Sequence, residues 1–206
     1  MKRPLHGRPG TLAAVAEEAR LVDTGAGLVP QSDGWFVLNV RDAAWMRHDV
    51  FGARCGFEAD GRIAKERPAL QVQQHSQVGF RLHVLEPGKA STMYHRESDQ
   101  EDFLVLSGEC LLIVEGEERR LRPWDFFHCA PHTTHSFVGA GDGPCLILMV
   151  GARTEEGTIL YPRDEVALRH DAGVEQDTPS PQEAYSRFPH WRLGRPDRWD
   201  ELPWNR

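Results

Sequence analysis

The sequence predicts an all-β fold, an antiparallel barrel or sandwich, from the length, order and spacing of its apolar segments. From residue 71 onward, short segments of about four to eight residues that read as strands follow one another closely. Turn residues separate them, and the 206-residue chain contains 19 glycines and 14 prolines. Many short strands joined by tight turns are typical of barrels and sandwiches rather than of helical bundles.

The first 34 residues are expected to form a helix and a loop ahead of the barrel. Thr11–Val22 has apolar residues at helical spacing, and Thr11 is a suitable N-cap. Thr24–Gly34 contains three glycines and a proline, which predicts a loop. The next two apolar segments, Trp35–Val40 and Phe51–Glu58, are interpreted as strands.

The barrel is expected over residues 35–160, with its core at 78–150. Val78–Glu86 alternates, so that Arg81 and His83 share one face and Phe80 lies on the other. The remaining strands are expected at Phe103–Leu106, Cys110–Val114, Phe126–Ala130, Ser136–Val138 and Cys145–Val150.

Residues 161–206 are expected to form an irregular C-terminal extension. Pro162–Leu168 is a candidate short helix, Asp171–Pro181 has the polar composition of a linker, and Tyr185–Arg206 carries three tryptophans interleaved with arginines. Such a tail could bind RNA by stacking and charge, or it could cover the barrel or a partner subunit with its aromatic rings. Acidic residues within the tail favour the second interpretation.

Composition excludes several classes of function. The net charge of −7 argues against a general binder of nucleic acids or anionic membranes. The longest apolar run, Cys145–Val150, is too short to span a bilayer. The four cysteines form no CxxC pair, and no secretion signal is visible, so we expect buried free thiols in a cytoplasmic protein.

The densest group of metal-capable side chains lies around His95. In an extended segment His95 and Glu97 point to the same face, two residues apart. Glu101 opens the next strand, where Phe103 shares its face and would form an apolar floor, and His135 begins a later strand. Imidazole and carboxylate ligands together suit Fe(II), Mn(II), Ni(II) or Zn(II).

These residues resemble the two motifs of the cupin superfamily. His95-x-Glu97-x(3)-Glu101-x(6)-Gly108 is similar to the first motif, Gly-x(5)-His-x-His-x(3 or 4)-Glu-x(6)-Gly, with Glu97 in place of the second histidine. A register that starts at Tyr94 would lose two ligands. His135 fits the histidine of the second motif, and 15 residues separate the two motifs.

The resemblance implies a cupin-type antiparallel β-barrel, the double-stranded β-helix or jelly roll. It also implies a divalent metal, Fe, Mn, Ni or Zn, held by His95, Glu97, Glu101 and His135. Glu101 is the candidate catalytic base, and Glu97 is the other carboxylate that could take this role. The alternative is a pocket without metal, in which the histidines only hydrogen-bond the carboxylates. The resemblance further implies a homodimer.

Two functions remain open at this point. One is a metal-dependent enzyme of the oxygenase or isomerase type that acts on a small polar molecule. The other is a barrel that only binds a sugar or an organic acid, because one fold hosts many chemistries. Candidate pocket residues are Tyr94, Arg81, His83, Phe103 and His128. Arg81 and His83 could meet a substrate carboxylate or phosphate, unless their strand face is turned toward solvent.

Overall fold

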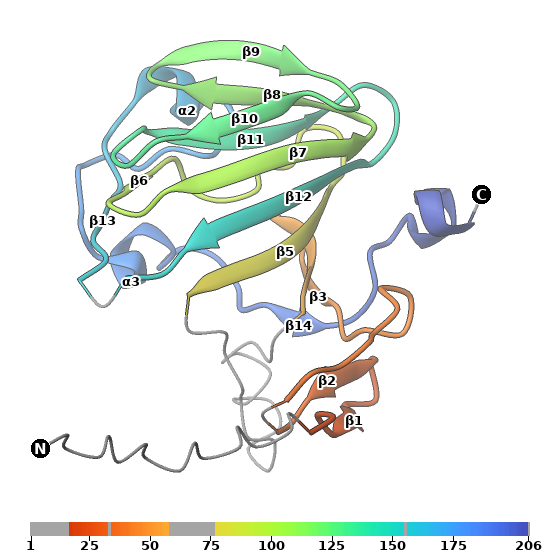
Figure 1. Ribbon diagram of the computed structural model, residues 1–206. Coiled ribbons are helices and arrows are strands. Elements are labelled where there is room, and N and C mark those ends of the chain that lie inside the picture. The colour runs from red at the N-terminus through yellow and green to blue at the C-terminus, as the bar shows by residue number, and fades with distance from the viewer. Residues whose placement is uncertain (1–16, 33, 58–76, 155, 206) are drawn as a thin grey trace, which may run out of the picture.

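The computed structural model describes residues 17–32, 34–57, 77–154 and 156–205, and two sheets dominate it (Figure 1). The larger sheet is antiparallel, with the strand order β10-β7-β12-β5-β4-β3-β14. Its strands are β3 (Met46–His48), β4 (Gly52–Gly56), β5 (Val78–Leu85), β7 (Glu101–Ser107), β10 (Phe126–Cys129), β12 (Cys145–Ala152) and β14 (Arg192–Leu193).

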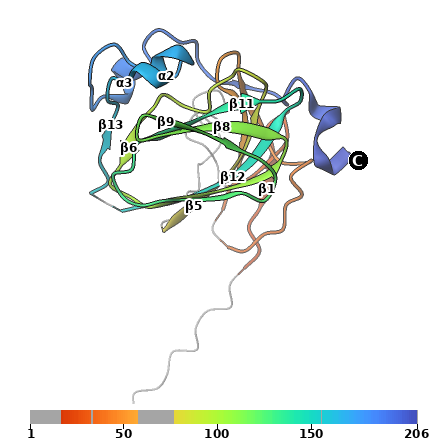
Figure 2. The ribbon, with the colours of Figure 1, turned by 90° about the horizontal axis from the view of Figure 1, so that it is seen from above.

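The second sheet has the order β11-β8-β9 and closes the barrel. Its strands are β8 (Glu109–Val114), β9 (Glu117–Leu121) and β11 (His135–Ala140). A short pair, β6 (Arg96–Glu97) with β13 (Ile159–Leu160), lies beside it. Seen end-on, the strands surround a common interior, with the helices outside (Figure 2). The expected all-β class and antiparallel barrel are confirmed.

Alternating side chains divide the larger sheet into two faces. The interior holds a buried cluster that includes Phe103, Leu112, Phe137 and Ile147. Leu82, Val84 and Leu146 point to the opposite face and pack against Trp45. The alternation predicted for β5 is therefore confirmed, and the strand contributes to two hydrophobic clusters.

Gly108 makes the turn between β7 and β8 possible. Its φ is +70°, a conformation that favours glycine, and a Cβ there would lie 2.3 Å from the carbonyl oxygen of Pro144. The glycine of the first motif is therefore required by backbone conformation and by close chain approach.

The predicted N-terminal helix is wrong where it can be checked. Residues 11–16 of the predicted Thr11–Val22 helix lie outside the described residues, and the rest is extended. Leu21–Asp23 forms β1, which pairs antiparallel with β2 at Leu28–Pro30, inside the segment expected to be a loop. Gly27, with φ at +123°, turns the chain between them. Pairing of backbone groups outweighs the helical spacing of the side chains.

Two further strand predictions differ from the structure. Trp35–Val40 contains only an isolated bridge at Trp35, and the strand that follows is β3. β9 was not predicted, because its sequence, Glu-Glu-Arg-Arg-Leu, carries no apolar alternation. β9 is an edge strand with four exposed residues, so its pairing with β8 holds a segment without a hydrophobic pattern in the sheet.

The C-terminal segment packs onto the barrel. It contains α2 (Glu165–Arg169), capped by Asp164, then α3 (Pro181–Ala184) and two 3-10 turns, η1 (Trp199–Glu201) and η2 (Pro203–Asn205). The centroids of the Trp199 and Trp204 rings both lie 5.6 Å from that of Trp45. The tail thus covers the barrel with its aromatic rings.

No helix of the described part is both long and apolar enough to cross a bilayer. All four cysteines are buried free thiols, as expected. The domain boundaries at residues 34 and 160 stay a prediction.

Candidate metal centre

Three chain segments bring three of the four predicted ligands together inside the barrel. His95, just before β6, and His135, the first residue of β11, exchange two backbone hydrogen bonds of 3.1 and 2.8 Å. Glu101 is the first residue of β7 on the facing sheet. The candidate ligand atoms of these three residues all lie within 4.8 Å of one another. Sequence spacing alone could not show this, because the contact joins both sheets.

The hydrogen bonds of the two imidazoles leave their Nε2 atoms available. The Nδ1 of His95 lies 2.8 Å from the carbonyl oxygen of Met93, and the Nδ1 of His135 lies 3.2 Å from that of Thr133. A carbonyl oxygen only accepts, so in the neutral ring Nδ1 carries the hydrogen and Nε2 has the lone pair. This is the arrangement in which a histidine binds a metal through Nε2.

The carboxylate of Glu101 is the least satisfied group of the cluster. Its Oε2 is buried and makes no hydrogen bond within the described part of the chain, although the Nε2 of His135 is 3.4 Å away. Burial and the nearby charge of Glu97 raise the pKa of Glu101 to about 7. A buried carboxylate without a partner is costly, and a cation would remove that cost.

The two histidines respond differently to the same surroundings. Burial, with a smaller effect of His95, lowers the pKa of His135 to about 3, so the ring is neutral near pH 7. Burial also disfavours the charged form of His95, but the hydrogen bond to Glu97 and the charges of Glu101 and Glu97 outweigh it and raise the His95 pKa. His135 is therefore neutral near pH 7, whereas the two carboxylates favour the charged form of His95.

The donor set fits a divalent metal ion. Two imidazole nitrogens and a carboxylate suit Fe(II), Mn(II), Ni(II) or Zn(II), and the unsatisfied Glu101 oxygen marks the position where a cation would be stabilised. Glu97, the fourth predicted ligand, is outside the group of mutually close atoms. Its Oε1 lies 3.5 Å from the Nε2 of His95, and its side chain is 34% exposed.

Aromatic rings surround the inner side of the cluster. The ring centroid of His135 is 5.0 Å from that of Phe103 and 5.9 Å from that of Phe127. Phe103 therefore lies where the sequence predicted an apolar floor. Tyr161, whose ring is 5.7 Å from that of His95, was not anticipated. It follows β13, far along the chain, and no local pattern connects it to the site.

A cavity of about 470 Å³ opens between the two sheets next to the cluster. It is lined by Leu112, Val114, Glu115, Glu117, Arg119 and Phe127. Phe127 also contacts the His135 ring, and Val114 is the cross-strand partner of His135. The cavity therefore adjoins the candidate metal centre and is large enough for a small molecule.

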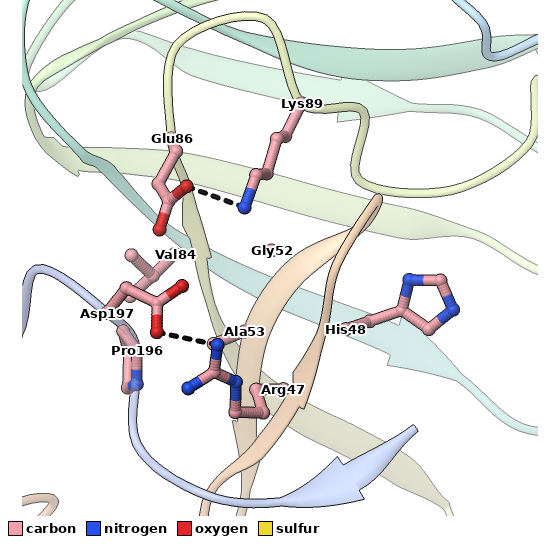
Figure 3. Close-up of a pocket in the computed structure, with 9 residues that line it drawn as sticks. All are labelled: Arg47, His48, Gly52, Ala53, Val84, Glu86, Lys89, Pro196 and Asp197. Atoms are coloured by element: carbon pink, nitrogen blue, oxygen red, sulfur yellow. Dashed lines mark ion pairs between the residues drawn. The ribbon is translucent and has the colours of Figure 1, made fainter. Parts of the chain in front are cut away.

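A second hollow is too small to bind a substrate. Its volume is about 10 Å³, and its charged groups pair with each other, Arg47 with Asp197 and Lys89 with Glu86, at 2.6 Å each (Figure 3). Such a volume holds at most one water molecule.

Two of the predicted pocket residues, Tyr94 and His128, lie away from the metal cluster. Tyr94 is buried in another cluster, and its hydroxyl accepts a hydrogen bond from the Gly116 backbone. His128 alternates with Phe127, so it points outward, and its ring pairs with Asp102 at 2.7 Å.

His83 and Arg81 share an inward strand face, rather than one turned toward solvent. His83 is buried and its Nε2 is 2.7 Å from the carbonyl oxygen of Phe51. Burial lowers its pKa to about 4, so it is a neutral core residue near pH 7. Arg81 is the cross-strand neighbour of Met149 in the barrel core, and its positive charge lowers the pKa of Glu101.

Comparison with known proteins points to one family. No curated protein matches the sequence significantly. Solved structures that resemble the chain include a sugar phosphate isomerase of the cupin superfamily from Silicibacter pomeroyi, with 23% identity over 63% of this chain and 88% of that chain and a TM-score of 0.48. An RmlC-like cupin from Shewanella frigidimarina has 16% identity over 61% and 96% of the two chains, with a TM-score of 0.44.

The polyketide cyclase RemF from Streptomyces resistomycificus has 14% identity, covers 57% of this chain and 79% of its own, and has a TM-score of 0.45. The family model of the cupin domain matches residues 81–151, which run from β5 to β12 and include all three residues of the metal cluster. The matched segment covers about a third of the chain and is a cupin domain.

Proposed function

We propose that this cupin binds one divalent metal ion through His95, Glu101 and His135 and acts as an enzyme on a small polar molecule. The observation that carries the proposal is the buried Oε2 of Glu101, which makes no hydrogen bond to a described residue and lies beside two imidazoles whose Nε2 atoms are available. Fe(II), Mn(II), Ni(II) and Zn(II) are the candidate ions.

Each group of the site has a defined role in this proposal. A bound ion would supply Lewis-acid or oxygen-activating chemistry. The carbonyls of Met93 and Thr133 orient the two histidines, and the rings of Phe103 and Phe127 exclude water from the inner side. The adjoining cavity would admit the substrate.

Glu97 is proposed as the group that moves a proton. Its carboxylate is next to His95 and is more exposed than that of Glu101, so it can reach both a substrate and solvent. Glu97→Gln is then expected to retain the metal and lose turnover. If Glu97 is instead a fourth ligand, the same variant loses metal affinity as well.

Turnover by the metal-loaded protein tests the proposed enzyme function. Protein loaded with each candidate ion is assayed with catechols, keto acids and sugar phosphates, and His135→Ala is the matched inactive variant. We expect turnover of one class by the wild type, and none by His135→Ala. Metal-dependent binding of a compound without turnover would contradict the enzyme role and favour a ligand-binding cupin.

A further inference from the structure

The chain around His95 is held from two sides. On the barrel side, the backbone of His95 exchanges two hydrogen bonds with that of His135. On the other side lie elements that follow residue 151, where the matched cupin domain ends, and β13, α2 and α3 gather with β6 on one side of the barrel (Figures 1 and 2). β13 pairs with β6, and the ring of Tyr161, the residue after β13, contacts that of His95. Residues outside the cupin domain therefore border a candidate metal ligand inside it.

The peptide group between Met93 and Tyr94 connects the His95 ring to the C-terminal segment. Its carbonyl oxygen accepts the hydrogen of His95 Nδ1, at 2.8 Å. Its N–H donates to the carbonyl oxygen of Ala172, at 2.6 Å. Successive hydrogen bonds through one peptide group polarise each other, so the second bond strengthens the first. The orientation of the His95 imidazole therefore depends on a peptide group that Ala172 holds in place.

A defined turn at the end of α2 fixes Ala172. The backbone N–H of Asp171 donates to Leu168 at 3.2 Å, and that of Ala172 donates to Ala167 at 3.0 Å. Together with the positive φ of Asp171, +57°, these two bonds form a Schellman motif. Ala172 is also fully buried. Its position is therefore set by a helix end that lies outside the cupin domain.

Tyr185 holds the other side of Met93. Its hydroxyl oxygen accepts a hydrogen bond of 3.1 Å from the N–H of Met93, which is a buried residue. The Tyr185 ring also contacts that of Tyr161, with 5.8 Å between the centroids. Removal of the hydroxyl would take this acceptor from a buried N–H and release one side of the residue whose carbonyl orients His95.

We propose that the C-terminal segment positions the metal ligand His95, through the hydroxyl of Tyr185 and the carbonyl of Ala172. The proposal rests on the proposed function, because it concerns the metal centre of the same site. Both groups are positioning groups, which act through the backbone of Met93 and Tyr94 and not on the metal or the substrate. A ligating histidine is oriented by the acceptor of its second ring nitrogen, and that acceptor is here held from outside the cupin domain.

Two variants of the full chain test this inference, each with a matched control. Tyr185→Phe removes the hydroxyl and keeps the ring. Its control is Tyr94→Phe, because the Tyr94 hydroxyl also accepts a backbone N–H bond, from Gly116 at 2.9 Å, and the variant keeps the Tyr94 backbone unchanged. Asp171→Val strains the turn, since a β-branched residue disfavours a positive φ. Its control is Trp124→Val, at an exposed residue with a φ of +75°.

Two measurements compare these variants with the wild type. Zn(II) affinity is measured by competition with a chromophoric chelator. The Nδ1–H signal of His95 is followed by proton–nitrogen NMR of the metal-free protein, and His95→Gln identifies the signal by its absence. This signal reports on the ring itself, so a general loss of stability does not shift it.

We expect Tyr185→Phe and Asp171→Val each to weaken Zn(II) binding about tenfold, as expected when a metal-ligating histidine loses its orienting contacts. Both should also shift the His95 signal or speed its exchange with water. Tyr94→Phe and Trp124→Val should bind Zn(II) as the wild type does and leave the His95 signal unchanged.

A Tyr185→Phe variant that matches Tyr94→Phe in both measurements would overturn the inference. Weaker Zn(II) binding with an unchanged His95 signal, or a changed signal with unchanged binding, would overturn it as well. Failure of the proposed function is distinguishable, because the NMR measurement needs no metal. If the wild type binds no Zn(II), a His95 signal that changes in Tyr185→Phe and not in Tyr94→Phe would still support the positioning role, and an unchanged signal would overturn it.

Discussion

Glu101→Gln is expected to stabilise the metal-free protein at alkaline pH and to abolish its stabilisation by metal. Glutamine keeps the shape of the side chain and removes the charge. The wild-type protein must hold an ionised carboxylate at pH 8 in a buried position where Oε2 has no described hydrogen-bond partner. The variant avoids that cost, but it lacks the anionic ligand.

The expected magnitude follows from the pKa of Glu101, which burial raises from 4.5 to about 7. Between these pH values the folded state binds more protons than the unfolded chain, so the stability of the metal-free protein falls as the pH rises. The loss is complete above pH 7. At about 1.4 kcal/mol per pKa unit it amounts to about 3 kcal/mol, or about 6–12 °C in melting temperature for a chain of this size.

Thermal unfolding at pH 5 and pH 8, with and without metal, measures both effects. At pH 8 the metal-free variant should melt several degrees above the wild type, and at pH 5 the difference should be small. Metal at a hundredfold excess over its Kd should stabilise only the wild type, by about 3 kcal/mol. Glu109→Gln, at a half-exposed glutamate that pairs with Arg120 away from the metal cluster, is the control. Equal melting temperatures at pH 8 would contradict the cost of the ionised Glu101, and equal stabilisation of the variant by metal would contradict its role as a ligand.

Three further substitutions test other parts of the structure. Burial lowers the pKa of His83 to about 4, so the free energy of unfolding of the wild type should decrease by up to about 3 kcal/mol as the pH falls from 6.5 to 4. His83→Gln should reduce this decrease, measured by urea titration, and parallel pH curves for the two proteins would contradict the prediction. Leu202→Ala should cost about 2–5 kcal/mol because the side chain is fully buried under the tail tryptophans, whereas a cost within experimental error would show that the tail is detached. Gly108→Ala should cost more than about 2 kcal/mol, measured by denaturant unfolding, because of its positive φ and the Pro144 carbonyl; an unchanged midpoint would contradict that.

The barrel strands were predictable because their side chains alternate between the barrel interior and the opposite face of the sheet. This alternation places recurring apolar residues along β5, β7, β8 and β12. β9 could not be found in this way, because backbone pairing alone holds it at the sheet edge. The extended end of the predicted N-terminal helix was missed for the same reason, since its strand pairs locally with β2.

The metal cluster was predictable in composition but not in geometry. Spacing selected His95, Glu101 and His135, and the structure brings them within 4.8 Å of one another. Phe127 and His128 are consecutive in β10, so only one of them can face the site. The register of β10 with β7 shows that it is Phe127. The alignment of Gly79 and Gly151 with Glu101 could not be predicted, because these residues become neighbours only through strand pairing.

The metal content of untagged protein is the most direct test of the proposed metal centre. Wild type and the His95→Ala/His135→Ala double variant are incubated with Fe(II), Mn(II), Ni(II) or Zn(II), desalted and analysed by mass spectrometry for metals, with circular dichroism to confirm folding. We expect one divalent ion per chain in the wild type and none in the folded double variant. A wild type without stoichiometric metal, or a double variant that retains it, would contradict the proposed metal centre.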